Sequence, residues 1–387
     1  MKRPIRLLLI IAVSFLAGAL WYRHQLPPYK QLREAYLAFR QPSAPPQLPP
    51  RSIEQVKFEL PESGPPDAAR LTALYDRLRA AAFSQSPQVN LVEKKSSDPF
   101  EVGAKRTDVY QAQMAFGCTS NIHLFYPSSQ TVRSNSLFIF HQGHRGPWTP
   151  NKHLIRALLD AQFHVAAFEM PFSANFNKPS DGQNVCDFSY DDEVLGKIGI
   201  YAHSSFLVAQ NFTKQTGIHP LSFFLAPIKS FVDYAEQELS LAKFRMAGIS
   251  GGGWTTTVYG ALDRRIGTAF SVAGDMPYTW RIMARSRGDY EQYEILKFGT
   301  YFELYMLDTY DGEEFSRVKY NLFNSFDDCC FQSNQFDLAS LQNTVNQAIS
   351  RISGQPETGK FRVVEFENDK HSISDEMVTF IVEHAGE

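Results

Sequence analysis

A single serine stands among glycines in "KFRMAGISGGGWTTTVYGAL", the segment Lys243–Leu262. An apolar run ends at Gly248, Ser250 follows, and a helix-forming run begins at Gly252, so G-x-S-x-G lies between a predicted strand and a predicted helix. A serine on such a turn has a strained backbone and a hydroxyl above the sheet, and the crowded turn needs glycine on both sides. We predict that Ser250 is a nucleophile. The alternative is a glycine-rich turn with an incidental serine, and the pattern disfavours nucleotide binding because it matches neither phosphate-binding motif.

A serine hydroxyl becomes an effective nucleophile only when a neighbouring base accepts its proton. Of the ten histidines, His371 is placed best, because it follows the last predicted strand in "FENDKHSIS" and precedes the final helix. His384 lies near the end of that helix. His141 and His144 follow an earlier strand, where we expect them to shape a loop. We therefore predict His371 as the base, with an ordinary surface-loop histidine as the alternative.

The base needs a carboxylate that fixes its tautomer and stabilises the imidazolium. Asp327 ends "YNLFNSFDD", after the strand that precedes the last helix–strand pair, which gives the chain order Ser250, Asp327, His371. Asp328 is its immediate rival, and Asp275 is a second rival because an acid can also come from the preceding strand. We predict Asp327 from its spacing to the strand end.

Two backbone amides must stabilise the negative charge that develops on a carbonyl oxygen. Gly251 directly follows the nucleophile, so its amide is the first candidate. The second should come from the loop "HQGHRG" after the strand "SLFIF", where Gly143 permits close approach. We predict the amide of His144, and an ordinary glycine turn is the alternative.

Apolar strands alternate with helical segments from about Asp108 to the C-terminus. This order predicts an α/β fold with a mostly parallel central sheet flanked by helices. Ligand sites in such sheets lie at the carboxyl ends of the strands, and each candidate residue above follows a predicted strand. We therefore expect these residues to meet at one edge of the sheet.

At these residues the chain resembles the α/β-hydrolase superfamily. The resemblance covers the chain from about Asp108 onward and rests on "FHQGHRG", "GISGGGWTT", "NSFDDCC" and "DKHSIS" in that order. It is similar to bacterial acetyl-xylan-esterase-like and dienelactone-hydrolase-like branches, although a serine stands where dienelactone hydrolases use cysteine. The resemblance implies the α/β-hydrolase fold with a cap insertion. It also implies hydrolysis of an ester, or less often an amide, without metal or cofactor.

The insertion from about 172 to 226 is expected to form the cap over the strand ends. Its aromatic side chains could line an acyl pocket, or they could form the core of the cap itself: Phe206, Phe212, Phe223 and Phe224. The stretch 277–300 contains no signal from which a pocket residue can be predicted. Asp308 and Asp311 are interpreted as solvated loop charges.

The N-terminal end "MKRPIRLLLIIAVSFLAGALWYRH" has a basic flank and an apolar run, Leu7–Tyr22. It predicts a signal-anchor or a cleaved signal peptide over residues 1–24, with Ala17–Ala19 as a small-residue cleavage site. The proline-rich stretch 25–64 is then a tether, and 65–387 is the hydrolase domain. We expect contact with a membrane through this segment, or export to the periplasm or medium.

Charge is nearly balanced, with 38 Lys and Arg against 41 Asp and Glu, so nucleic acid is not expected as a partner. Four cysteines, Cys118, Cys186, Cys329 and Cys330, are too few for a disulfide scaffold. A bond between the adjacent Cys329 and Cys330 would strain the backbone, so we interpret the cysteines mainly as small buried residues. If the domain is exported, one or two bridges are the alternative, and the sequence does not assign their pairing.

These observations lead to one main expectation and two alternatives. The main one is a serine hydrolase that cleaves a small-molecule ester through an acyl-enzyme. The alternatives are a peptidase or amidase of the same fold, and a binding protein that keeps the fold without catalysis.

Overall fold

The computed structural model describes residues 56–58, 66–95, 98–128, 135–144, 146–172, 189–192, 196–199, 203–206, 209–284, 286, 288–355 and 360–386. The chain divides into two compact units, Met1–Glu54 and Gln55–Glu387, and all described residues belong to the second. The predicted signal segment, 1–24, and most of the predicted tether, 25–64, lie outside the described residues. Among the helices that are described, none is long and apolar enough to span a bilayer.

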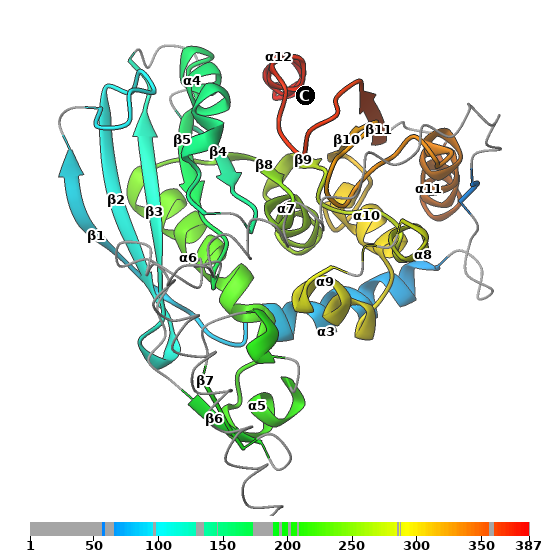
Figure 1. The fold of residues 1–387 in the computed structure, drawn as a ribbon, viewed down its shortest axis with the longest axis horizontal. Coiled ribbons are helices and arrows are strands. Elements are labelled where there is room, and N and C mark those ends of the chain that lie inside the picture. Colours follow the sequence, from blue (N-terminus) through cyan, green and yellow to red (C-terminus); the bar gives the residue numbers. More distant parts are fainter. Residues whose placement is uncertain are drawn as a thin grey trace, which may run out of the picture. The chain divides into compact units, whose positions relative to one another are not determined.

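One sheet of nine strands runs through the second unit in the order β1-β2-β3-β5-β4-β8-β9-β10-β11 (Figure 1). The strands are β1 (Gln88–Lys95), β2 (Arg106–Gln113), β3 (Thr119–Tyr126), β4 (Ser136–His141), β5 (His164–Phe168), β8 (Lys243–Ile249), β9 (Ile266–Val272), β10 (Val318–Asn324) and β11 (Phe361–Phe366). From β5 to β11 all neighbouring strands are parallel, whereas β1, β2, β3 and β5 pair antiparallel. The predicted mostly parallel sheet is therefore confirmed.

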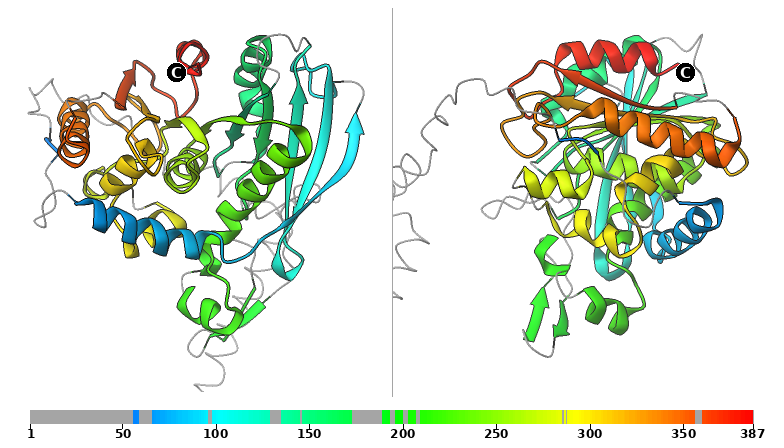
Figure 2. Two further views of the ribbon diagram at one scale, coloured as in Figure 1. Left: turned by 180° about the vertical axis from the view of Figure 1, so that it is seen from behind. Right: turned by 90° about the vertical axis from the view of Figure 1, so that its right-hand side faces the viewer.

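Helices cover both faces of this sheet (Figures 1 and 2). They are α3 (Ala68–Ala82), α4 (Lys152–Asp160), α6 (Leu221–Leu239), α7 (Gly251–Leu262), α10 (Tyr301–Thr309), α11 (Leu338–Ser353) and α12 (Asp375–His384). On one face α4 packs against α12, and on the other α7 contacts α3, α6 and α10. Every residue of β4, β5 and β10 is buried. Burial on both faces explains the mostly apolar sequences of β4 and β5, whereas β10 also buries Lys319, Asn321 and Asn324.

Two elements differ from the sequence-based expectation. Strand β1 was not expected, because it is an exposed edge strand with little apolar alternation in "QVNLVEKK". Helix α6 was expected to begin at Pro227 but begins at Leu221, with Pro227 inside it. A proline removes a backbone hydrogen bond there. Burial of Phe223 and Phe224 in the same turns offsets that loss.

Part of the predicted cap, 172–226, is described: the hairpin of β6 (Ser189–Asp192) and β7 (Gly196–Gly199), and α5 (Ala209–Thr216) (Figure 1). Its four phenylalanine rings are at most 1% exposed, and three of them contact one another. Phe224 packs on Trp254 of α7 instead. These rings therefore form an internal core, which was one of the two interpretations of the sequence.

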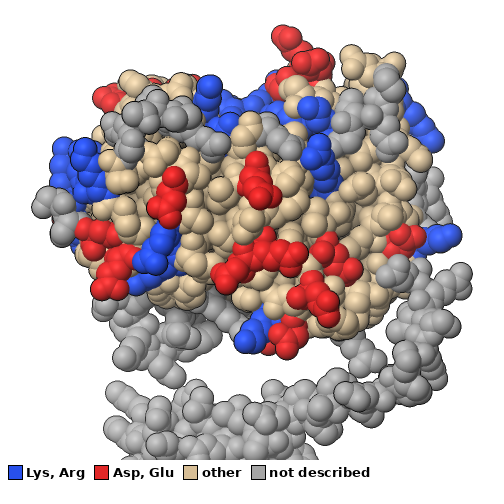
Figure 3. All heavy atoms as spheres, turned by 90° about the horizontal axis from the view of Figure 1, so that it is seen from above, with Lys and Arg blue, Asp and Glu red and all other residues tan. Residues whose placement is uncertain are grey.

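The surface carries charges of both signs. Basic and acidic side chains both occur on the face drawn in Figure 3, in keeping with the formal net charge of −3.

Candidate active site

Ser250 occupies the sharp turn between β8 and α7. Its backbone angles are φ 58° and ψ −124°, a combination that residues other than glycine rarely adopt. The turn is fixed from both sides, because the Ser250 amide donates to the carbonyl of Val272 at 2.9 Å and its carbonyl accepts from Trp254 at 3.0 Å. The order strand, serine, helix thus agrees with the nucleophile-elbow geometry that the sequence predicts.

Crowding explains the two flanking glycines. A Cβ atom on Gly248 would lie 2.1 Å from the carbonyl oxygen of Gly252, and one on Gly252 would lie 2.0 Å from that of His141. Neither clash can be relieved by a rotating side chain, because both contacted atoms belong to the backbone. Any larger residue would therefore displace the serine.

His371 and Asp327 contact each other through their side chains. Nδ1 of His371 lies 2.7 Å from Oδ2 of Asp327, whose side chain is fully buried. The amides of Cys329 and Cys330 donate to the other oxygen at 2.9 and 3.0 Å. Burial raises the pKa of Asp327, but the hydrogen bonds from His371 and the two amides outweigh it and hold that pKa below its ordinary value.

The protonation of this pair follows from its hydrogen bonds. An ionised carboxylate only accepts, so Nδ1 of His371 donates to Asp327 and Nε2 keeps its lone pair if the ring is neutral. Nε2 is buried and has no hydrogen-bond partner among the described residues. It is therefore free to accept a proton from a group in the adjoining cavity.

The rival acids lie elsewhere. Asp328 is exposed and accepts a hydrogen bond from the backbone amide of His371, not from its ring. Asp275 is buried next to Asn321 and Lys319. Asp308 belongs to the same buried cluster, 3.4 Å from Lys319, so its interpretation as a solvated loop charge is wrong. Burial raises the pKa of Asp308 to about 6 despite the lysine.

The loop after β4 packs directly on the serine turn. A Cβ on Gly143 would lie 2.7 Å from both the Ile249 carbonyl oxygen and the Ser250 Cβ, so glycine permits this approach. The His144 ring lies over Gly251, where a Cβ would come within 2.3 Å of it. His141 is buried, which lowers its pKa to about 4 and keeps its ring neutral. The loop predicted to supply the second amide thus borders the nucleophile.

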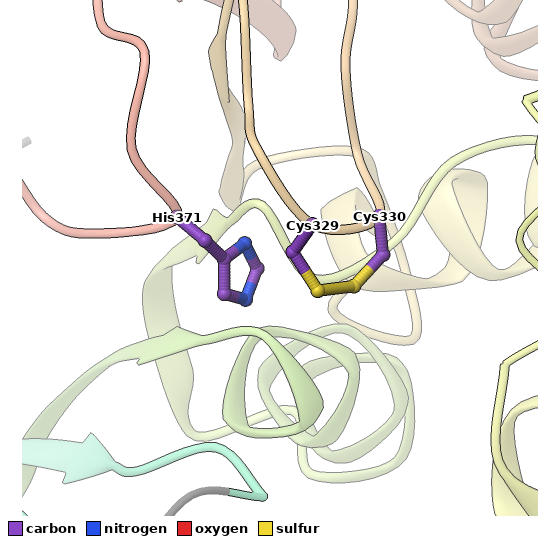
Figure 4. Close-up of side chains that lie close together, drawn as sticks. All are labelled: Cys329, Cys330 and His371. Carbon is purple, nitrogen blue, oxygen red and sulfur yellow. A yellow bond between two sulfur atoms is a disulfide. The ribbon is translucent and has the colours of Figure 1, made fainter. Parts of the chain in front are cut away.

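Cys329 and Cys330 form a disulfide with each other, and its sulfur atoms lie beside the His371 ring (Figure 4). Cys118 is also disulfide-bonded. The interpretation of the cysteines as small buried hydrophobic residues is therefore wrong for the adjacent pair, since Cys329 is exposed as well as bonded. The bond links the two residues whose backbone amides donate to Asp327.

A cavity of about 540 Å³ is lined by Ser250, His371 and His144 together with further residues. One group of lining residues, which we term the strand-end wall, follows β4, β8, β10 and β11 and includes Gly143, His144, Ser250, Cys329, Cys330, Phe331 and His371. A second group, which we term the helical wall, belongs to the segment after β9 that contains α8 (Tyr278–Met283) and α9 (Tyr290–Glu294). It consists of Arg281, Ser286, Gly288, Asp289 and Gln292.

No pattern in the sequence indicated the helical wall. Its helices are short, and it contains no motif with fixed spacing. The feature that marks the helical wall is the burial of charged side chains in its segment. Burial can be predicted from a sequence only where a periodic pattern exists, and this segment has none.

Behind the helical wall, Glu291 is fully buried and contacts two histidines. Its carboxylate lies 2.9 Å from Nε2 of His144 and 2.7 Å from Nδ1 of His203. Nε2 of His203 donates to the Pro171 carbonyl at 2.8 Å, so both ring nitrogens are donors and His203 is an imidazolium. Burial lowers the pKa of His203, but Glu291 more than compensates and raises it.

Two groups of potential metal ligands lie near the cavity, and neither donor set fits an ion. Cys329 and Cys330, beside His371, are joined in a disulfide and offer no thiolate. In the group of His144, His203 and Asp289, both nitrogens of His203 already donate hydrogen bonds. No step of the proposed chemistry is therefore assigned to a metal.

Comparison with known proteins supports the fold. Acetyl xylan esterase 1 from Thermoanaerobacterium superposes with a TM-score of 0.51 at 13% identity, covering 84% of this chain and 99% of that one. Glucuronoyl esterase from Solibacter usitatus gives 0.51 at 13% identity, with 86% and 98% covered. The chain therefore has the α/β-hydrolase fold, as its motifs predict.

Sequence comparison adds less. The family described as PhoPQ-activated pathogenicity-related protein matches residues 225–327, which run from α6 to Asp327. No curated protein matches the chain significantly by sequence.

Proposed function

We propose that the protein is a serine hydrolase that cleaves a carboxylic ester through an acyl-enzyme. One observation carries the proposal: the buried Asp327 orients His371, whose unpartnered Nε2 adjoins the cavity that Ser250 lines from a strained turn. Nucleophile, base and orienting acid are the three roles that such a reaction requires. The two structural neighbours named above are esterases, which agrees with this class of reaction.

The proposed reaction has the usual steps of an acyl-enzyme mechanism. Ser250 Oγ attacks the ester carbonyl carbon as His371 Nε2 accepts the hydroxyl proton, and Asp327 stabilises the resulting imidazolium. The amides of Gly251 and His144 hold the negative oxygen, aided by the N-terminal end of α7. The imidazolium then protonates the leaving alcohol. A water molecule, deprotonated by His371, attacks the acyl-enzyme and releases the acid.

A fluorophosphonate probe tests this proposal, because it reacts only with an activated serine. We expect the full-length protein to be labelled, the Ser250→Ala variant to show no labelling, and His371→Ala to be labelled far more slowly. A folded parent that resists probes of several sizes would contradict the proposal and favour a binding protein. Matched 4-nitrophenyl esters and 4-nitroanilides of one acyl group would then distinguish an esterase from an amidase.

We also propose that the domain works outside the cytoplasm, tethered to a membrane or exported. Support comes from the basic-flanked apolar run Leu7–Tyr22 and from the disulfides at Cys118 and Cys329–Cys330, which suit an oxidising compartment. Fractionation of cells that express the full chain, with N-terminal sequencing, tests this. An uncleaved protein in the cytosolic fraction would contradict it.

A further inference from the structure

Arg281 is a buried cation in the wall of the proposed active site. Its side chain is only 2% exposed, yet it lines the same cavity as Ser250 and His371. Gly288 makes room for it, because a Cβ at that position would lie 2.9 Å from Nη1 of the guanidinium. Gly288 has φ +80°, so a larger residue would be strained there even without this contact.

The guanidinium is under-satisfied. Of its five N–H donors, one on Nη1 donates to Gln292 and one on Nη2 donates to Ser286 Oγ at 3.0 Å. Nε is buried and has no partner among the described residues. The Phe331 ring lies 4.5 Å from the guanidinium carbon. Each of these neighbours is neutral.

The nearby carboxylates are directed elsewhere. Asp289 lines the cavity, but its oxygen lies 3.3 Å from Nε2 of His144. Glu291 is shared between His144 and His203. Within the described part of the chain, Arg281 forms no ion pair. A buried charge without a counter-ion is costly, so its presence beside a reaction site calls for a ligand that supplies the charge.

We propose that Arg281 binds a carboxylate of the substrate, so that the preferred substrates are esters that carry a second, free carboxylate in the acyl part. This inference rests on the proposed hydrolysis at Ser250. A guanidinium presents planar paired donors that match a carboxylate. Among the described lining residues Arg281 is the only lysine or arginine, and together with Asp289 it suits one negative charge better than a phosphate dianion.

The structure also limits the distance between the two groups. Phe331 lies 4.5 Å from the Arg281 guanidinium carbon and 6.1 Å from the His371 ring centroid. The sum of these distances, about 11 Å, is the upper limit for the separation of guanidinium and imidazole. Linear diacid half-esters with four to eight carbons therefore span the relevant range, at roughly 1.3 Å per chain bond.

Matched substrates test the proposal. The 4-nitrophenyl half-esters of succinate to suberate are compared with neutral esters in which a branched methyl pair replaces the free carboxylate, such as 5-methylhexanoate for glutarate. The proteins are the parent, Arg281→Gln, Arg281→Lys and the control Arg351→Gln, whose arginine is exposed in the last turn of α11.

We expect the parent to prefer at least one anionic ester by about tenfold or more in kcat/KM. Arg281→Gln should lose about 10- to 100-fold on that ester, mostly in KM, and less than about twofold on its neutral match. Lysine should restore part of the preference, and Arg351→Gln should leave it intact. Equal losses on both esters, or no preference in the parent at any chain length, would overturn the proposal.

A binding measurement separates this inference from the catalytic one. Monomethyl glutarate, succinate and suberate are titrated calorimetrically into Ser250→Ala and into Ser250→Ala/Arg281→Gln. Binding to the first that is lost in the second supports an anion site at Arg281 even if the parent hydrolyses nothing. Absence of binding to Ser250→Ala, or equal binding to both proteins, overturns it.

Discussion

The two walls of the cavity differ in how they are built. The strand-end wall depends on backbone: a strained serine, glycines that nothing larger can replace, and loops fixed at the ends of parallel strands. The helical wall depends on side chains: Arg281, Asp289 and Gln292 on short helices without a repeating pattern. The difference suggests that the first wall performs a general reaction and that the second selects what reacts.

The largest expected effect is the loss of activity on removal of Ser250, and it tests whether the strand-end wall acts on all esters alike. Replacing Ser250 by alanine should lower kcat/KM by about 10⁵-fold or more on every ester, anionic or neutral, because the nucleophile is common to all. Steady-state kinetics with the matched esters measure this, and circular dichroism checks the fold. A loss confined to one class of ester would contradict the division of labour.

Asp327 and its neighbour Asp328 allow a matched test of which carboxylate orients His371. Asp327→Asn should reduce kcat by about 10⁴-fold, because the amide no longer fixes the histidine tautomer. Asp328→Asn should cost less than about tenfold, since Asp328 accepts only from the His371 amide. Both variants are measured at saturating substrate. Similar losses in the two would show that the pairing of Asp327 with His371 is not decisive.

Two buried arginines, Arg317 and Arg281, are expected to contribute differently to the free energy of unfolding. Arg317 donates to the carbonyls of Gly260 and Tyr310, at 2.7 and 3.0 Å, and so holds the fold together. Arg317→Met should cost about 3 kcal/mol or more of the free energy of unfolding. Arg281→Met should cost nothing or add about 1 kcal/mol, because it removes an unpaired charge. Urea unfolding measures both, and a loss above about 2 kcal/mol for Arg281→Met would make it a structural residue.

The adjacent disulfide gives a smaller effect. Alkylation of denatured, unreduced protein should leave Cys329 and Cys330 unmodified, as peptide mass spectrometry can verify. The double change to serine should lower kcat about fivefold, because the two residues whose amides bind Asp327 are then no longer linked to each other. Modified cysteines in the unreduced protein would show that the bond is absent.

The smallest effect concerns pH. The pKa of His203 is raised by Glu291, so the stabilisation from this pair is complete below the ordinary histidine pKa and declines as pH rises through the raised one. The pKa of Glu291 is lowered, so the stabilisation also declines when pH falls below the ordinary glutamate range. The Tm difference between the parent and His203→Asn should therefore be greatest near pH 5 to 6. A difference that grows above pH 8 would contradict the charged pair.

The contrast between the walls also explains what the sequence could predict. The parallel strands were evident because both faces are buried, and Ser250 because only glycine fits around its turn. His371 was predicted from the order of strand ends, and Asp327 was preferred to its neighbour Asp328 only by its spacing to the strand end. A role for Arg281 could not be predicted from the sequence. The proposed role depends on the burial of its side chain without a counter-ion, and only the folded structure shows that burial.

The most direct test of the account is to trap the acyl-enzyme. The parent and Arg281→Gln are mixed with the preferred 4-nitrophenyl half-ester, quenched in acid within milliseconds, and digested for mass spectrometry. The account predicts a diacid adduct on Ser250 that forms more slowly in Arg281→Gln at equal low substrate concentration. Hydrolysis of the ester with no adduct on Ser250, or an adduct on another residue, would contradict it.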